Sequence, residues 1–246
     1  MNVSLFQAAA ALNANSRWQE AIAENLASSG IPGFKKQELS FGAIQGGLMK
    51  STSAETRYSL PSAKVMTNFR AGEMKSTGNP TDVAIEGPGF FEVQLPNGTR
   101  ALTRDGEFQQ NAQGQLTTKQ GYLVMSSNGP VQFDPGKGGP ISISSTGAIS
   151  QGSDFLGQIK VVDVDDPQAL TSLGSGFFLS ESPKAKVTEV PFPSLRAGYL
   201  ENANTSTSAE MVNLISAMRQ YEANQRLIQN QDERMGRVIS ELGNPS

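Results

Sequence analysis

The stretch TSAEMVNLISAMRQYEANQRLIQNQDERMGRVISEL, residues 207–242, sets the architecture of the whole chain because it predicts one long helix. Thr207 and Glu210 have the spacing of a capping box at its start. Apolar residues then recur at seven-residue intervals, the period of a coiled-coil seam; they are Leu214, Tyr221, Ile228, Met235 and Leu242, flanked by Met211, Met218 and Val238. At 1.5 Å per residue this helix is roughly 54 Å long. It is longer than a domain built from the rest of the chain is wide, so it must run along something else.

A second, weaker helix is predicted at the other end of the chain, over residues 4–28. Ser4 and Gln7 have capping-box spacing, and Gly30 with Pro32 ends the helical pattern. Its apolar residues form a narrow seam, interrupted by Gln19, of Leu5, Leu12 and Leu26 with Ala8, Ala9, Ile22 and Ala23 beside them. So thin a seam cannot stabilise a lone helix, since isolated helices gain most of their stability from packing.

Two kinds of partner are open to these helices. They can pack on the rest of their own chain as ordinary amphipathic helices, or they can pack between chains as a coiled coil. A seam of two residues in seven is narrower than the stripe that a globular surface helix needs, which favours packing between chains.

The middle of the chain predicts β structure without helical crossovers. The stretch DVAIEGPGFFEVQLPNGTRALTRDGEF, residues 82–108, alternates apolar and polar residues. Turn signals follow at short intervals, at Asn97-Gly98, Asp105-Gly106, Gln113-Gly114, Gln120-Gly121 and Asn128-Gly129. Short strands at this spacing predict a barrel or a sandwich.

The expected fold is therefore α+β, with discontinuous N- and C-terminal coiled-coil helices and a central all-β domain of barrel or sandwich kind. We expect a terminal helical domain from residues 1–37 plus 202–246, and a central β domain over residues 78–183. Residues 38–77 and 184–201 are expected to be extended connectors between the two.

The composition excludes several classes of function. The 246 residues carry a net charge of -3 and contain no Cys and no His, which removes disulfides, thiol nucleophiles, imidazole bases and the common zinc ligand sets. Lys35-Lys36 is the longest basic run, so no nucleic-acid partner is expected. The first residues, MNVSLFQAAAALNANSRW, lack the features of a cleavable signal peptide or a membrane span.

Three chemical alternatives are weaker than a structural role. Asp163, Asp165 and Asp166 could hold a cation through oxygen ligands, although the Gly and the distant Glu of an EF-hand loop are missing. A pair of carboxylates could cleave cell-wall glycan, but no pattern favours it. The glycines of GPGFF and GKGGP precede neither a P-loop Lys nor a helix, so turns explain them. No catalytic residue, metal or cofactor is expected.

Three ordered motifs extend across nearly the whole chain. The first is ENLASSGIPGFKK. The second is STGNPTDVAIEGPGFFEVQLPNGTRALTRDGEFQQNAQGQLTTKQGYLV, and the third is AGYLENANTSTSAEMVNLISAMRQYEANQRLI. Together they resemble the bacterial flagellar basal-body rod and hook proteins, and the matching positions of the first motif are Asn25, Leu26, Ala27, Gly33, Phe34 and Lys35. The family often has Asn and Thr after the Asn-Leu-Ala motif, where this chain has Ser28-Ser29 and then Ile31-Pro32.

The resemblance implies a non-enzymatic axial subunit of the basal body that stacks helically with its own copies and with other rod and hook proteins. It implies terminal helices in an inner tube, and export through the flagellar type III apparatus without a cleaved signal. Residues 38–77 are short and lack an insertion resembling that of the distal rod protein, so the chain is most similar to a proximal-rod subunit. A distal rod or hook subunit is the alternative within the family, and a globular β protein binding a cell-wall ligand is the alternative outside it.

The residues expected at the assembly interface come from both helices and from the turn after the first. They are Leu5, Leu12, Ile22, Asn25, Leu26, Ala27, Gly33, Phe34, Met211, Leu214, Met218, Tyr221, Ile228, Met235 and Leu242.

Overall fold

The computed structural model describes residues 3–51, 54–134 and 139–242, and the chain divides into two units. Unit 1 contains residues 1–26, 37–67 and 207–246, and unit 2 contains residues 27–36 and 68–206. Both ends of the sequence therefore belong to unit 1, and the chain passes between the units four times.

Two α-helices and nineteen strands are seen in the described residues, with one short 3-10 helix. The helices are α1 (Val3–Ser28), α2 (Thr207–Leu242) and the 3-10 helix η1 (Pro167–Ala169). The first strands are β1 (Gln37–Ser51), β2 (Ala54–Thr67), β3 (Met74–Ser76), β4 (Val83–Ile85), β5 (Phe90–Gln94), β6 (Arg100–Thr103), β7 (Phe108–Gln110), β8 (Leu116–Thr118), β9 (Leu123–Ser126) and β10 (Gly129–Pro130). The others are β11 (Ile141–Ile143), β12 (Ala148–Gln151), β13 (Asp154–Gln158), β14 (Val161–Val164), β15 (Thr171–Gly174), β16 (Phe177–Leu179), β17 (Val187–Glu189), β18 (Leu195–Ala197) and β19 (Tyr199–Glu201).

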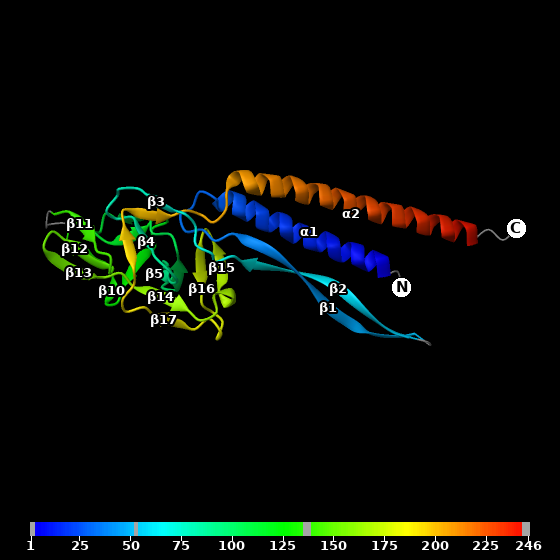
Figure 1. Cartoon of the computed structure of the whole chain (residues 1–246), viewed down its shortest axis with the longest axis horizontal. Coiled ribbons are helices and arrows are strands. Elements are labelled where there is room, and N and C mark those ends of the chain that lie inside the picture. The colour runs from blue at the N-terminus through cyan, green and yellow to red at the C-terminus, as the bar shows by residue number, and fades with distance from the viewer. Residues whose placement is uncertain (1–2, 52–53, 135–138, 243–246) are drawn as a thin grey trace. The chain divides into compact units, whose positions relative to one another are not determined.

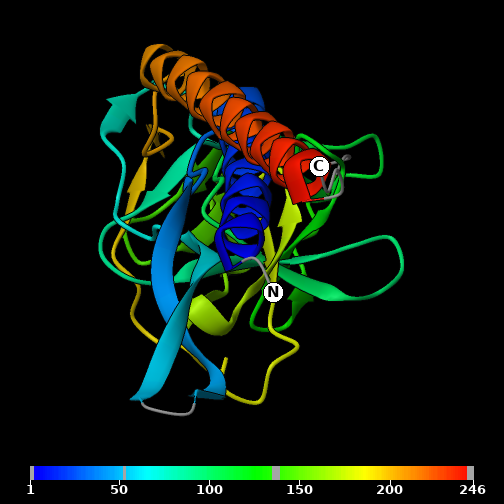
Figure 2. The same cartoon turned by 90° about the vertical axis from the view of Figure 1, so that its right-hand side faces the viewer.

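Unit 1 is built from the two helices and one β-ribbon. In Figure 1 the helices run in opposite directions, and in Figure 2 α2 passes across α1. The boundaries of α2 are those that the sequence predicts. The ribbon pairs β1 with β2 in antiparallel register from Gln37 opposite Thr67 to Ser51 opposite Ala54, with one irregularity between Gln45 and Leu48. Residues 38–77, expected to be an extended connector, thus contain a long hairpin.

Unit 2 contains the remaining strands, and every pairing in it is antiparallel. The main sheet has the order β15-β16-β6-β5-β9-β8-β7, with β14, β17 and β10 joined to it. A second sheet pairs β11, β12 and β13, and two small sheets pair β18 with β4 and β19 with β3. The expectation of a barrel was wrong, because no sheet closes on itself among the strands that the structure describes.

The core of unit 2 lies on both faces of the main sheet. Neighbouring apolar residues on one strand point to opposite faces, so Phe91 joins the larger cluster and Phe90 the smaller one. Val161 and Val162 on β14 divide in the same way, as do Phe177 and Phe178 on β16. Strands buried on both faces read as continuous apolar runs, which explains the doublets in the sequence.

Four of the five turn signals lie in turns between strands. Gly98, Gly114, Gly121 and Gly129 all have positive φ, between 78° and 122°. The interpretation of Asp105-Gly106 as a hairpin turn was wrong. β6 and β7 on either side pair with other strands, and Gly106 is required because a Cβ there would lie 1.7 Å from the Val83 carbonyl oxygen.

Candidate assembly helices and a buried ionic junction

Helix α2 has one covered side that follows a heptad. Its buried and half-buried residues are spaced alternately by four and three: Glu210, Leu214, Ala217, Tyr221, Asn224, Ile228 and Gln231. We call this set the seam. Ala217 is fully buried and Glu210 is nearly so, whereas the others are half-buried.

The predicted interface residues of α2 differ in exposure. Leu214, Tyr221 and Ile228 lie in the seam. Met211 and Met218 lie beside the seam and are each 51% exposed, and Met235, in line with the seam, is 46% exposed. The side chains of Leu242 on α2 and Leu5 on α1 lie outside the part of the structure described.

On α1 the covered side is more polar and contains smaller residues than the sequence predicts. Of the predicted interface residues, Ile22 is buried and Leu12 and Leu26 are half-buried. Ala27 is exposed. The residues that reach full burial beside Ile22 include Ala14, Asn15, Ala21 and Asn25.

Asn25 of the Asn-Leu-Ala motif joins α1 to the start of β1. Its Nδ2 donates to the Gln37 carbonyl at 2.9 Å, and its Oδ1 accepts from the Gln37 N–H at 2.7 Å. The Gln37 side chain in turn donates to Glu24 at 2.7 Å. The amide of Asn25 thus pairs with the backbone of Gln37 in the way that a neighbouring strand would.

The Gly-Phe pair that follows α1 occupies a tightly packed site. Gly33 has φ of +67°, and a Cβ there would lie 2.3 Å from the backbone of Arg104, so no other residue fits. Its N–H donates to the Glu201 carbonyl at 2.6 Å. Phe34 beside it is only 3% exposed. The Phe34 ring is therefore covered by its own chain.

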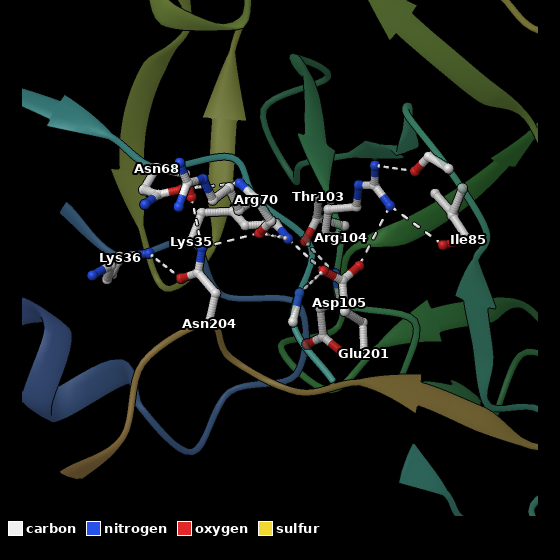
Figure 3. A network of polar contacts seen from close by, with 12 residues as sticks. Lys35, Lys36, Asn68, Arg70, Ile85, Thr103, Arg104, Asp105, Glu201 and Asn204 are labelled. Atoms are coloured by element: carbon white, nitrogen blue, oxygen red, sulfur yellow. Dashed lines mark hydrogen bonds and ion pairs between the residues drawn. The ribbon is translucent and has the colours of Figure 1, made fainter. Parts of the chain in front are cut away.

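Next along the chain, Lys35 enters a buried ionic junction, which we define as Lys35, Arg104 and Glu201 (Figure 3). The Lys35 ammonium pairs with Glu201 Oε1, and both side chains are 1% exposed. Arg104 lies 3.4 Å from Glu201 Oε2 and is 8% exposed. One carboxylate thus holds two cations, and it also accepts the Gly72 N–H at 2.8 Å.

The junction gathers the three segments of unit 2 through which the chain connects with β1, β2 and α2. Lys35 also donates to the Arg70 carbonyl at 3.0 Å. Asn204 completes the arrangement: its Oδ1 accepts from Lys36 N–H at 2.7 Å, and its Nδ2 donates to the carbonyls of Asn68 and Arg70 (Figure 3). Segments 33–36, 68–72 and 201–204 are consequently fixed to one another.

Burial works against the charges of the junction. It lowers the pKa of Lys35 and the pKa of Arg104, while the attraction of Glu201 raises both pKa values again. Nearby, burial raises the pKa of Asp105 to about 6. The Asp105 carboxylate accepts from the Glu107 N–H at 2.9 Å, which opposes that shift.

Reasoning from the sequence alone missed this junction. It treated Lys35 as part of a basic pair and as a position of the first family motif, and it did not single out Arg104, Glu201 or Asn204. The one available signal was position: Lys35 lies in the first family motif, and Glu201 and Asn204 lie in the third.

The aspartates considered for a cation serve the local backbone. Asp163 Oδ1 accepts from the Val164 N–H at 2.8 Å, and Asp166 caps η1 by accepting from Gln168 N–H at 3.1 Å. No group of three metal-ligating side chains occurs in the described ranges. Within those same ranges, neither helix is apolar enough over a sufficient length to cross a membrane.

Two family models match the chain. The flagellar hook protein FlgE/F/G D1 domain matches residues 84–151, in unit 2. The flagellar basal body rod FlgEFG protein C-terminal model matches residues 196–241, which include the Glu201 end of the junction and most of α2.

The curated proteins similar to this chain are flagellar rod proteins, and the similarity extends over almost the whole length of each. Flagellar basal-body rod protein FlgG of Borreliella burgdorferi is 32% identical over 257 aligned positions, which cover 95% of this chain and 96% of the relative. Flagellar basal-body rod protein FlgF of Mesorhizobium japonicum is 29% identical over 248 positions, covering both chains completely. FlgF of Caulobacter vibrioides is 31% identical and covers 91% of each chain.

The alignments differ in their gaps. The 248 positions shared with the Mesorhizobium FlgF contain all 246 residues of this chain, so they include almost no insertion relative to it. The 257 positions shared with the Borreliella FlgG contain only 95% of this chain, so that relative has residues this chain lacks.

Proposed function

This chain belongs to the family of flagellar basal-body rod proteins, and we propose that it polymerises helically through its terminal helices to build the torque-transmitting shaft. Its family is one of structural proteins rather than enzymes. In the proposed assembly, residues 1–37 and 202–246 form a coiled-coil axial core and residues 78–183 form the β domain around it, with residues 38–77 and 184–201 as connectors.

The observation that carries this proposal is an uncovered apolar strip beside the seam of α2. Met211, Ile215 and Met218 lie there with more than half of each side chain exposed. Apolar residues that recur along one helix face and stay uncovered in a single chain favour packing against another protein. A shaft of stacked copies would supply that packing at every subunit.

The buried ionic junction supports the same proposal. A subunit that transmits torque must hold in place the segments that lead into its helices and ribbon. The junction fixes three such segments, 33–36, 68–72 and 201–204, within unit 2. Breaking a buried ion pair by removing one partner is strongly destabilising, so the three segments resist separation.

Within the rod we propose a proximal position. The chain lacks an insertion resembling that of the distal rod protein, and the Mesorhizobium FlgF aligns with all of it and adds almost no residues. The partners proposed are copies of this chain, other rod and hook proteins, and the flagellar export apparatus. The proposed location is the rod that spans the periplasm, reached without a cleaved signal peptide.

Quantitative mass spectrometry of purified hook-basal bodies tests both statements. Subunits of known copy number serve as internal standards, and the intact N-terminal peptide is measured in the same sample. A handful of copies per particle, with Met1 or Asn2 retained, is the expected result. Many more copies would move the chain to the distal rod or hook, and its absence from the particles would overturn the proposal.

A further inference from the structure

The two sides of α2 have different roles in a single chain. The seam is covered, whereas the other residues of α2 over 207–237 are exposed, and an apolar strip lies beside the seam in the first turns. We call that strip the outer stripe; it consists of Met211, Val212, Ile215 and Met218, which are 51%, 64%, 53% and 51% exposed. Residues three and four apart share a helix face, so these four side chains form one continuous apolar surface.

Helix α1 also has an exposed side opposite its buried residues. We call it the outer face of α1; it consists of exposed residues spaced alternately by four and three, Ala9, Asn13, Ser16, Glu20, Ala23 and Ala27, and the exposed Arg17 lies at its edge. Most of them are small, so another helix can approach the backbone of α1 closely along this line. The face contains one carboxylate, that of Glu20.

We infer that the outer stripe of α2 in one copy packs on the outer face of α1 in the next copy. This inference rests on the proposed function and specifies the contact by which copies join. Because two different surfaces meet, the contact is heterologous, and repeating a heterologous contact that does not close produces an open helical filament. The same surface meeting itself would stop at a dimer.

The direction of the contact follows from the polarity of such a filament. All copies point the same way along it, and α1 and α2 run in opposite directions within each copy (Figure 1). We place both helices along the filament axis, so an α2 helix that lies on the α1 helix of a neighbour is antiparallel to it. In this arrangement the larger side chains of the outer stripe fill the space above the small Ala residues near the C-terminal end of the outer face, Ala23 and Ala27.

Charge fixes one register of this antiparallel contact. When Val212 lies opposite Ala27, the residue seven positions further along α2 lies opposite the residue seven positions earlier on α1. Arg219 then lies opposite Glu20. Both residues are exposed, and neither forms an ion pair or hydrogen bond with the rest of the described chain. The two charges are thus available to each other across the contact.

The seam is not the surface that joins copies in this inference. Leu214, Tyr221 and Ile228 are already covered within the chain. A substitution in the seam should act first on the fold of the single chain, and one in the outer stripe should act first on assembly.

A charge exchange in a motile host tests the contact. Glu20→Arg and Arg219→Glu are introduced separately and together into the full chain, which is supplied to a strain that lacks it. We expect each single variant to lower the number of copies in purified hook-basal bodies by about tenfold, since like charges facing each other at an interface are strongly unfavourable. The double variant should restore copies and swimming.

Controls separate assembly from folding and from the proposed function. Glu181→Arg and Lys184→Glu make the same charge changes at exposed positions of unit 2 and should incorporate normally. Ile215→Asp should block incorporation, whereas Leu227→Asp, equally exposed but off the outer stripe, should not. Circular dichroism of each purified variant checks that the helices persist.

The outcomes are distinguishable. If the unaltered chain is absent from hook-basal bodies, the proposed function fails. If the unaltered chain is present and either single exchange incorporates normally, or if the double exchange fails to restore incorporation, the inferred contact is wrong.

Discussion

Unit 2 and unit 1 bury their side chains to very different extents. The larger core cluster of unit 2 contains sixteen apolar residues that are at most 5% exposed, drawn from strands along the whole unit. The seam of α2 contains one fully buried apolar residue, Ala217, and its large members are only half-buried. The comparison indicates that unit 2 is complete in one chain, whereas unit 1 has surface left for a neighbour to cover.

Each unit has one buried nitrogen without an acceptor in the part of the chain that the structure describes. In unit 2 it is Nε of Arg104, although the charges of the ionic junction are paired. On α1 it is Nδ2 of Asn15. A buried donor without a partner lowers stability, so α1 is not at its stability optimum.

The largest loss of stability is expected from a substitution in the core of unit 2. Phe91→Ala removes a fully buried ring and should lower the free energy of unfolding by about 3–5 kcal/mol. Phe155→Ala is the matched control, because that ring is 68% exposed, and its effect should stay within about 0.5 kcal/mol. Denaturant titration of both variants measures the difference. Equal losses would show that unit 2 has no single core.

The next effect is expected at the ionic junction. Glu201→Gln leaves Lys35 and Arg104 without a carboxylate, and should cost about 3 kcal/mol, the lower end of the range for a broken buried pair, since Gln still accepts hydrogen bonds. Glu86→Gln is the control, as its pair with Arg196 is exposed, with an expected cost below about 1 kcal/mol. Hydrogen exchange of residues 68–72 should accelerate only in the first variant.

A smaller effect is expected from Asp105, with a sign that depends on pH. Because the pKa of Asp105 is raised from 3.8 to about 6 in the folded chain, its contribution to stability is fully present below pH 3.8 and is lost as pH rises through about 6. Asp105→Asn should therefore stabilise the chain by about 2 kcal/mol at pH 7.5 and hardly at all at pH 4. Thermal unfolding at both pH values measures this. A gain of equal size at both would rule out the titration of Asp105 as its cause.

The smallest effect concerns the two sides of α2. Leu214→Ala in the half-buried seam should cost about 1 kcal/mol in the single chain, roughly half the penalty of a fully buried Leu. Ile215→Ala on the outer stripe should cost no more than about 0.5 kcal/mol. Urea titrations of the purified chains measure both. A larger loss at Ile215 would mean that the covered side of α2 has been assigned wrongly.

The helices and most turns of this protein could be predicted from the sequence because they depend on neighbours in the chain. The period of Leu214, Tyr221 and Ile228 indicates a helix, and the glycine at position 98 indicates a turn. The β1–β2 hairpin was not foreseen, since its strands lack a turn signal such as Asn-Gly and were interpreted as connectors.

The ionic junction could not be predicted for a different reason. Lys35 and Glu201 are 166 residues apart, and no local pattern shows that two charged residues so far apart will be buried together. Nor does a heptad reveal which helix face its own chain covers. The period groups the residues of α2 by side, and only the structure distinguishes the covered seam from the exposed Met211 and Met218.

The position of Glu201 also determines when this protein can finish folding. Its carboxylate and its backbone hold segments 33–36 and 68–72, and the strands beside it, β18 and β19, pair with β4 and β3 near the start of unit 2. A chain that emerges from a narrow channel with its N-terminus first therefore cannot close unit 2 until four-fifths of its length is outside. The contacts of Glu201 also join the two ends of unit 2. Unit 2 therefore becomes rigid only when the chain has emerged as far as Glu201.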